Sequence, residues 1–425
     1  MDPHGIARRI VTGDCAAIPG DPHNWMGWMS HPAALGSVVG SVQRAHLRHH
    51  EKTVLVGMGG SSSGAGMLAS ELGCTDLTIL DTSHPDTIQS TNFENVNLVV
   101  SSKSGGTVET IASMAYALSH GARASDLTII TDPGTPLDEL GQSLGAVVLQ
   151  GDPQTGGRFS ALSVFGIAPI LIAGATSVPE TVLGEEEWIE SFVHGMQAAP
   201  PSGWDTMTVS GDPLTSFTAL WEEQLLAEST GKDGKGLLPT PGAPRKILDI
   251  ALHVQRTHAF TVGLCTALGV NPFDQPDVES AKRRTFAELS SPTPDEFIDP
   301  ANLGGWIERG GPFVLQVYGP LSCAPEVASL RSSMAMMGHE VSAGLGPRYL
   351  HSTGQIHKGG SASLRFLQIL IEPSSTPERI SGREYSFHDL LGAQARGDFQ
   401  DLTGRGRDVV RVKLAPGEHL LGLLH

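Results

Sequence analysis

Three short segments of this sequence carry residue types that could together move a proton beside a bound anion. Residues 156–160 (GGRFS) supply a cation at Arg158, and residues 102–107 (SKSGGT) supply hydroxyls and backbone amides. Residues 227–232 (AESTGK) supply a carboxylate at Glu228. An anion anchor, a cation that stabilises a developing oxyanion and a proton-moving base are what an aldose–ketose isomerisation of a sugar phosphate requires.

The segment 102–107 follows a predicted strand and precedes a predicted helix. Backbone N–H groups at such a helix start form a concave anion site, and Ser102, Ser104 and Thr107 would add hydroxyl donors for a phosphate. Taken alone, the same residues suit an ordinary turn with helix-capping hydroxyls. Residues 57–61 (GMGGS) also permit close approach to a small ligand, although their spacing does not fit the GxGxxG pattern of dinucleotide loops.

Glu228 is predicted to lie on the apolar face of a helix that begins near Leu214. Gln224 precedes it by four residues and shares that face, together with Phe217, Leu220, Trp221 and Leu225. Glu222 and Glu223 are expected to point to solvent. Burial would raise the pKa of Glu228 towards that of a useful base. A structural glutamate paired with a buried cation explains the periodicity equally well.

The segment DQPDVESAK (residues 274–282) predicts a helix with Gln275 at its mouth, because Pro276 suits a first helical turn. Lys282 would share a face with the apolar residues Val278, Phe286 and Leu289. If it pointed inward, it would need an anionic or hydrogen-bonding partner. A lysine that extends along a half-buried face to solvent is the simpler interpretation of this pattern alone.

The polar segment 350–360 contains His351 and His357, which are candidates for acid–base groups or for ordinary loop residues. The loop interpretation is the more usual one. No cluster of His, Cys, Asp and Glu has a spacing typical of metal ligands. The sequence therefore predicts neither a catalytic metal nor a cofactor.

Short apolar runs that alternate with amphipathic segments predict an α/β fold with parallel sheets covered on both faces. In the first half these runs are 53–58, 96–101, 127–131 and 146–149. Ligands of such sheets bind beyond the carboxyl ends of the strands, where the glycine- and serine-rich loops lie. The longest apolar run, 161–178, contains glycines and a proline, so we interpret it as a buried helix and not as a membrane span.

The polar stretch AAPPSG (198–203) predicts a boundary, after which the strand pattern begins again at 206–209, 312–318 and 364–371. We expect a second doubly wound unit there, followed by an appended polar segment. The predicted parts are an N-terminal helical segment 1–45, a first unit 46–197, a second unit 198–373 and a C-terminal extension 374–425.

The composition of the 425-residue chain argues against nucleic acid or an anionic membrane as a partner. Its net charge is −17, from 45 acidic and 28 basic residues. The four cysteines have no paired spacing, which indicates free thiols in a reducing compartment. The N-terminus (MDPHGIARRI) has no apolar stretch typical of a secretory signal. A cytoplasmic protein is expected.

Five segments, in order over roughly residues 50–285, resemble the phosphoglucose isomerase family of SIS-domain proteins. They are GMGGS (57–61), SKSGGTVET (102–110), GGRFSALSVFG (156–166), AESTGKDGKG (227–236) and NPFDQPDVESAK (271–282). Two later segments, GPRYLHSTGQIHKGG (346–360) and SFHDLLGAQARGD (386–398), look most like the isomerase half of bacterial transaldolase–isomerase fusions.

The resemblance implies two flavodoxin-like SIS units, a homodimer with shared sites and conversion of glucose 6-phosphate to fructose 6-phosphate. It assigns Glu228 as the base and Arg158 as the group that stabilises the enediolate. Lys282 and either His357 or His351 would assist ring opening. The substrate-binding residues would be Gly60, Ser61, Ser102, Lys103, Ser104, Thr107, Gln224 and Gln275.

Two departures from the family pattern leave the sugar open. Gly106 stands where the family usually has a threonine, and the histidine segment follows the FDQP segment, whereas the family has it before. An isomerase of another anionic sugar, such as mannose 6-phosphate or a 6-sulfo sugar, is therefore an alternative. A non-catalytic SIS sensor of a sugar phosphate is a third, although a sensor would not need Glu228, Arg158 and Lys282.

Overall fold

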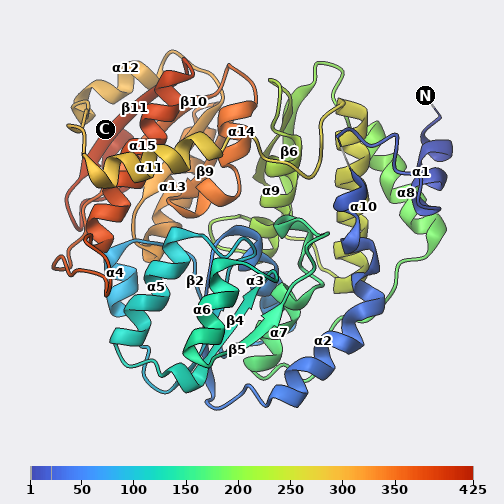
Figure 1. Ribbon diagram of the computed structural model, residues 1–425. Coiled ribbons are helices and arrows are strands. Elements are labelled where there is room, and N and C mark those ends of the chain that lie inside the picture. Colours follow the sequence, from blue (N-terminus) through green and yellow to red (C-terminus); the bar gives the residue numbers. More distant parts are fainter. Residues whose placement is uncertain (1, 21, 425) are drawn as a thin grey trace.

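The computed structural model describes residues 2–20 and 22–424, and its strands form three parallel sheets (Figure 1). The first sheet has five strands in the order β2-β1-β3-β4-β5, which is the order of flavodoxin-like folds. The predicted α/β class with parallel sheets is thereby confirmed. The five strands are β1 (Lys52–Gly57), β2 (Leu77–Leu80), β3 (Val96–Ser101), β4 (Leu127–Thr131) and β5 (Val147–Gln150).

Helices cover both faces of this sheet. Successive side chains of each strand point to opposite faces, and in β1, β3 and β4 all of them except Lys52 are buried. Val54 and Val56 pack towards α4, α5 and α6, whereas Leu55 packs towards α2, α3 and α7. The helices are α2 (His31–Ala45), α3 (Ser63–Glu71), α4 (Pro85–Ser90), α5 (Val108–Ser119), α6 (Pro136–Leu144) and α7 (Val164–Ile172).

The strands of the second half belong to two sheets. One sheet has two strands, β6 (Trp204–Val209) and β7 (Gly236–Pro241). The other has four strands in the order β11-β10-β8-β9: β8 (Phe313–Tyr318), β9 (Val341–Leu345), β10 (Arg365–Ile371) and β11 (Asp408–Leu414). One face of this sheet packs on α12 (Leu303–Ile307) and α13 (Ala324–Met336), and the other on α14 (Gly354–Gly359) and α15 (Phe387–Gly404).

The segment 374–425, predicted as a C-terminal extension, supplies α15 and β11. Strand β11 pairs with β10 in register from Arg365–Asp408 to Ile371–Leu414. Helix α15 covers the sheet and packs against α11 (Glu279–Ser290). This segment is therefore part of the second sheet and of its core.

The remaining helices are α1 (Pro3–Val11), α8 (Glu185–Gln197), α9 (Phe217–Thr230) and α10 (Ile250–Leu268). Helix α9 lies among α3, α10, α14 and β7, so three hydrophobic clusters meet on it. Over the described residues, none of the helices is long and apolar enough to cross a membrane. Helix α7 accounts for only the central part of the apolar run 161–178.

Candidate functional site

Two glycine-containing loops meet where the first unit faces α9. A Cβ atom on Gly60 would lie 2.2 Å from the carbonyl group of Gly157, so this contact requires glycine at position 60. The hydroxyl of Ser160 also donates to the carbonyl of Gly60 at 3.3 Å. The close contact fixes the short turn that carries Arg158 beside the C-terminal half of α9.

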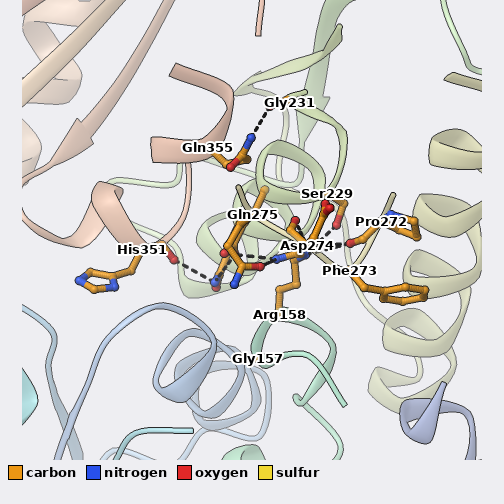
Figure 2. Close-up of polar contacts among 12 residues, drawn as sticks. Gly157, Arg158, Ser229, Gly231, Pro272, Phe273, Asp274, Gln275, His351 and Gln355 are labelled. Atoms are coloured by element: carbon orange, nitrogen blue, oxygen red, sulfur yellow. Dashed lines mark hydrogen bonds and ion pairs between the residues drawn. The ribbon is translucent and has the colours of Figure 1, made fainter. Parts of the chain in front are cut away.

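Arg158 is almost fully buried and all its nitrogens have partners (Figure 2). Nε donates to the Ser229 hydroxyl at 3.0 Å and to the Pro272 carbonyl at 3.2 Å. Nη2 donates to the carbonyls of Pro272 at 2.7 Å and Asp274 at 2.9 Å. Nη1 donates to Gln275 Oε1 at 3.0 Å. The guanidinium is therefore a fixed cation held by α9 and by the turn before α11.

Glu228 lies between this cation and an amide. Its Oε1 is 3.2 Å from Arg158 Nη1, and its Oε2 accepts from Gln224 Nε2 at 3.0 Å. Gln224 Nε2 also donates to the His351 carbonyl at 3.0 Å, while Gln224 Oε1 accepts from Ser63 Oγ at 2.8 Å. The Glu228 side chain retains 13% exposure, so a ligand can reach its carboxylate. We call this group of residues the Arg158–Glu228 site.

The expectation that Glu222 and Glu223 point to solvent is wrong, because both are only 3% exposed. Helix α9 is enclosed on all sides, so it has no solvent face for them. Glu222 accepts from the Ser210 amide at 2.6 Å and pairs with Arg245 at 3.1 Å. Burial raises the pKa of Glu223 to about 8, although Arg348 opposes the shift.

Two supporting residues of the site were not predicted. Lys232 is buried, and its amine donates to the Ser229 carbonyl at 2.9 Å. The same amine pairs with Asp274 Oδ1 at 3.1 Å. Burial lowers the pKa of Lys232, and the charge of Arg158 adds to this. Ser63, which fixes the Gln224 amide, is the second. Lys232 could have been predicted from its place directly after the AESTG segment. No sequence pattern distinguishes Ser63 from the neighbouring serines.

The residues of the predicted anion loop are in part bonded to one another. Ser102 Oγ lies 3.0 Å from Thr107 Oγ1, and Ser104 is exposed. The Lys103 amine pairs with the Asp132 carboxylate and donates to the Asp152 carbonyl at 2.9 Å. Its backbone amide donates to the hydroxyl of Ser61 at 3.3 Å. The structure therefore joins this loop to the GMGGS loop and directs the Lys103 amine to Asp132.

A cavity of about 190 Å³ lies beside this loop. Ser104, Gly106 and Thr107 line one side of it. Lys282 of α11, His351 of the 3₁₀ turn Arg348–His351 and Lys358 of α14 also line it. We call it the loop cavity. It adjoins the Arg158–Glu228 site through His351, whose carbonyl faces Gln224 while its ring points away from Arg158 (Figure 2).

The two candidate histidines have different surroundings. His351 Nε2 lies 2.8 Å from Oε1 of the buried Glu109, which also accepts from Gln394 Nε2 at 2.6 Å. Burial raises the pKa of Glu109, but the charge and hydrogen bond of His351 outweigh it, so this pKa lies below its usual value.

His357, in contrast, is 1% exposed and lies between the rings of Tyr349 and Phe366. Burial holds the pKa of His357 well below its usual value. Of the two, only His351 lines the loop cavity.

Lys282 does not point inward; its side chain extends to solvent, which was the simpler interpretation of the pattern. Its side chain is 51% exposed and pairs with Glu279 at 2.7 Å, and Phe286 is 53% exposed. Helix α11 instead packs on α15 through Ala281, Thr285 and Glu288. The helix is turned because Glu288 is buried against Arg396 of α15 at 2.7 Å. Lys282 nevertheless borders the loop cavity from its rim.

Within the described ranges, no three His, Cys, Asp or Glu side chains are grouped so that they could hold a metal ion. The polar groups of the site suit an anionic organic ligand: a buried cation, an adjacent carboxylate, amide side chains and hydroxyls near a cavity.

Several curated proteins share sequence similarity with this chain, although no protein-family model matches it. A glucose-6-phosphate isomerase of Rubrobacter xylanophilus is 34% identical over 167 residues, which cover 34% of this chain and 38% of that protein. A probable glucose-6-phosphate isomerase of Methanococcus maripaludis is 27% identical over 222 residues, covering 45% and 50%. A glucose-6-phosphate isomerase of Campylobacter jejuni is 28% identical over 203 residues, covering 42% and 50%.

Solved structures with similarity to the chain include tagatose-6-phosphate ketose/aldose isomerase from Escherichia coli. It is 14% identical, with 90% of each chain covered and a TM-score of 0.33. A hypothetical protein from Thermus thermophilus is 18% identical, with 99% of this chain and 85% of that chain covered and a TM-score of 0.35. Because both TM-scores are below 0.5, these similarities carry no argument about the fold, which follows from the strand pairing of this chain.

The matched segments cover half or less of the length of the three curated relatives. All three relatives are named as glucose-6-phosphate isomerases, which is the family that the five sequence segments resemble. The resemblance of this chain to the phosphoglucose isomerase family is confirmed.

Proposed function

We propose that this protein is an aldose–ketose isomerase of a sugar phosphate and that Glu228 is its proton-transferring base. One observation carries the proposal: the Glu228 carboxylate lies 3.2 Å from Arg158 Nη1 and 3.0 Å from Gln224 Nε2. A carboxylate beside a fixed, desolvated cation can move a proton while the cation stabilises the charge that develops on the substrate. The names of the curated relatives support the same reaction class.

In the proposed reaction Glu228 removes the C2 proton of an open-chain aldose phosphate. Negative charge then develops on the C1 oxygen, and a cis-enediolate forms. The proton of the C2 hydroxyl passes to the C1 oxygen, Glu228 returns its proton to C1, and the carbonyl group forms at C2. The product is the ketose phosphate, and Glu228 ends in its starting state.

Arg158 would act mainly through its Nη1 atom in this reaction. Nε and Nη2 are held by Ser229 and by two backbone carbonyls, whereas Nη1 contacts two side chains, Gln275 and Glu228. An enediolate oxygen would replace the Gln275 oxygen at Nη1. The amide of Gln275 would then be free to bind a sugar hydroxyl.

The phosphate would bind in the loop cavity, to Ser104, Thr107 and free amides of the loop. His351 is the better candidate for ring opening, because it lines this cavity and its ring is paired with the Glu109 carboxylate. Such pairing fixes the orientation of the imidazole and supports proton transfer. We propose glucose 6-phosphate and fructose 6-phosphate as the substrate pair; a homodimer and a cytoplasmic location stay predictions.

Proton NMR in deuterated water tests the proposal. Wild-type protein should convert glucose 6-phosphate to fructose 6-phosphate and exchange solvent deuterium into the transferred C–H position. Glu228→Gln should reduce the rate by about 10²–10⁴-fold while substrate still binds, as for removal of a positioned general base. The matched control is Glu279→Gln, a carboxylate that is 55% exposed on α11. Near-normal turnover of Glu228→Gln would exclude this residue as the base.

Gly106 supports a second candidate, an isomerase of another anionic sugar such as mannose 6-phosphate or a 6-sulfo sugar. A Cβ atom on Gly106 would meet no atom nearer than the Ser104 carbonyl oxygen at 4.0 Å, and its φ is not positive. Neither the backbone nor close packing therefore requires glycine here, and the residue enlarges the loop cavity.

The substitution Gly106→Thr separates the two candidates. A threonine hydroxyl would contribute about 1.5–3 kcal/mol to a charged group within reach. If the substrate is glucose 6-phosphate, kcat/KM should stay similar or rise. If the glycine accommodates a bulkier terminal group, Gly106→Thr should selectively lower kcat/KM for that sugar and spare glucose 6-phosphate. Binding of glucose 6-phosphate without turnover of any sugar would instead support a sensor.

A further inference from the structure

A second cleft lies beside α9, with Glu222 and Leu226 of that helix in its lining. It has a volume of about 310 Å³ and is lined by residues of α8, α9, α10, β6 and the segment after β7. Helices α8 and α10 lie on the right of Figure 1. This volume is at the lower end of the range of about 300–1,000 Å³ for small-molecule sites. None of the residues assigned to the proposed isomerisation lines it. We call it the Arg245 cleft.

Basic side chains dominate the lining of this cleft. Arg245 and Arg256 contribute guanidinium groups, and His194 and His253 contribute imidazoles. The Arg245 and Arg256 side chains are 64% and 48% exposed, so both are accessible from solvent. Such a cluster is notable in a chain with a net charge of −17.

The acidic side chain in the lining has no capacity left for a further donor. Both oxygens of the buried Glu222 are occupied, since Oε2 accepts from the Ser210 amide at 2.6 Å and Arg245 Nη2 contacts both oxygens at 3.1–3.2 Å. His253 Nε2 lies 3.1 Å from Oε1. Glu222 therefore anchors the wall of the cleft and holds Arg245 at its mouth.

The unused hydrogen-bonding groups of the two arginines are donors. Arg256 contacts Glu187 through Nη2 at 2.7 Å, and Arg245 contacts Glu222 through Nη2. The Nε and Nη1 groups of both arginines have no acceptor anywhere in the described part of the chain. Met207, Leu226 and Phe260 supply apolar wall between these donors.

We propose that the Arg245 cleft binds a small organic anion that carries a phosphate, sulfonate or carboxylate group on an apolar or aromatic body. Arg245 and Arg256 bind the anionic group with their free Nε and Nη1 donors, a geometry that suits planar or tetrahedral oxyanions. The apolar wall contacts the body of the ligand. This site is separate from the proposed isomerase site and does not depend on it.

Isothermal titration calorimetry with phenyl phosphate tests the proposal, with inorganic phosphate and phenol as the two partial ligands. Phenyl phosphate should bind more tightly than either partial ligand, because the cleft offers both donors and apolar wall. Arg256→Ala should weaken phenyl phosphate binding at least about tenfold, the loss expected for one charge-assisted hydrogen-bonding group. Arg245→Ala should have a similar effect.

Two control variants make the result specific. Arg379→Ala removes an arginine that is 75% exposed and outside the cleft, and it should leave the affinity unchanged. Ser104→Ala changes the loop cavity and should leave binding in the Arg245 cleft intact, even if it weakens a phosphate ester bound in the loop cavity. Arg256→Ala is the safer of the two cleft variants because its partner Glu187 is itself 52% exposed, whereas Arg245 contacts a buried carboxylate.

Four results would overturn the proposal. The first three are the absence of binding at millimolar phenyl phosphate, equal affinity of wild type and Arg256→Ala, and equal binding of phenol and phenyl phosphate. Loss of binding in Ser104→Ala alone would assign the anion to the loop cavity and would equally exclude the Arg245 cleft.

Discussion

At the scale of single residues, the hydrogen bonds that the Arg158 guanidinium donates hold the site together. Its nitrogens hold two backbone carbonyls, the Ser229 hydroxyl and the Gln275 amide in one rigid arrangement. A lysine ammonium has three donors at one point and cannot reach all four acceptors. Charge and geometry can therefore be separated experimentally at this position.

Arg158→Lys should lower kcat more than it raises KM, because the enediolate loses a positioned donor while the positive charge stays. It should also lower the thermal stability, because buried acceptors at Pro272 and Asp274 lose their donor at about 1–3 kcal/mol each. Steady-state kinetics and a thermal melt measure both effects. A change confined to KM would make Arg158 a substrate anchor only.

Ser63 is predicted to act through Gln224. Its hydroxyl donates to Gln224 Oε1 at 2.8 Å and so directs the amide nitrogen towards Glu228. Ser63→Ala should lower kcat several-fold and shift the acid limb of its pH profile, with little change in KM, because the amide can then rotate away from the base. Ser62→Ala is the matched control, since that hydroxyl donates only to the Gly59 carbonyl at 3.1 Å. Equal profiles for the two variants would exclude a positioning role.

At the scale of elements, α9 shows what helical periodicity can and cannot establish. The four-residue spacing placed Gln224 and Glu228 on one face, and their side chains are hydrogen-bonded. The same reasoning wrongly assigned Glu222 and Glu223 to solvent. Reasoning from periodicity assumes that one face of a helix is exposed to solvent. Helix α9 has no such face, because α3, α10, α14 and β7 enclose it. Only the tertiary packing contains that information.

Glu223 and Glu222, the two misassigned glutamates, should change the stability of the fold with pH in opposite directions. Burial raises the pKa of Glu223 from 4.5 to about 8, so the folded state retains a proton that the unfolded state releases above pH 4.5. Glu223 therefore reduces stability progressively as the pH rises from about 4.5 to 8. Glu223→Gln removes this penalty, and its melting temperature relative to wild type should increase from pH 5 to pH 8.

Glu222 is the matched comparison. Burial raises the pKa of Glu222, but His253, the Ser210 amide and Arg245 outweigh it, so the pKa lies below its usual value. Glu222 then stabilises the fold above the pKa of its unfolded state and loses this effect as the pH falls through the folded pKa. Glu222→Gln should be destabilising at pH 7 and less so in acid. Parallel pH profiles for the two variants would contradict both assignments.

The orientation of Lys282 on α11 also depends on tertiary packing and not on local periodicity. The sequence could group Lys282 with the apolar Phe286 and Leu289, but the phase of the helix is set by the buried ion pair between Glu288 and Arg396 of α15. That partner lies more than a hundred residues later in the chain. Gln275 does lie in the turn before α11, but its contact with Arg158 joins residues 117 positions apart in the chain.

At the scale of the whole molecule, the sequence was most informative about strands with continuous apolar runs. Strands β1, β3 and β4 lie where those runs occur, since such strands are buried on both faces. The C-terminal segment was harder to place. Its polar composition suggested an appended piece, but β11 pairs with β10 and α15 supplies Asp398, which pairs with Lys358 at 2.6 Å in the core. Such long-range pairing leaves no local signature.

A chain that ends at Pro373 should therefore fail to fold, although the boundary falls in a polar loop. It would expose the β10 edge and leave the fully buried Lys358 without Asp398, and breaking a buried ion pair in this way costs about 3–5 kcal/mol. The matched control ends at Pro416. It keeps α15 and β11 but removes the buried Leu420 and Leu423, which belong to the last 3₁₀ helix (Leu420–Leu424).

The control chain should remain folded with a lower melting temperature and retain isomerase activity, because none of the described residues after β11 contacts the Arg158–Glu228 site. Circular dichroism, thermal melts and the NMR assay distinguish the two truncations. A soluble, cooperatively melting and active protein ending at Pro373 would mean that residues 374–425 are an appended segment after all. Unfolding of both truncations would place the essential contribution in the terminal leucines, and not in the β10–β11 pairing or the Lys358–Asp398 pair.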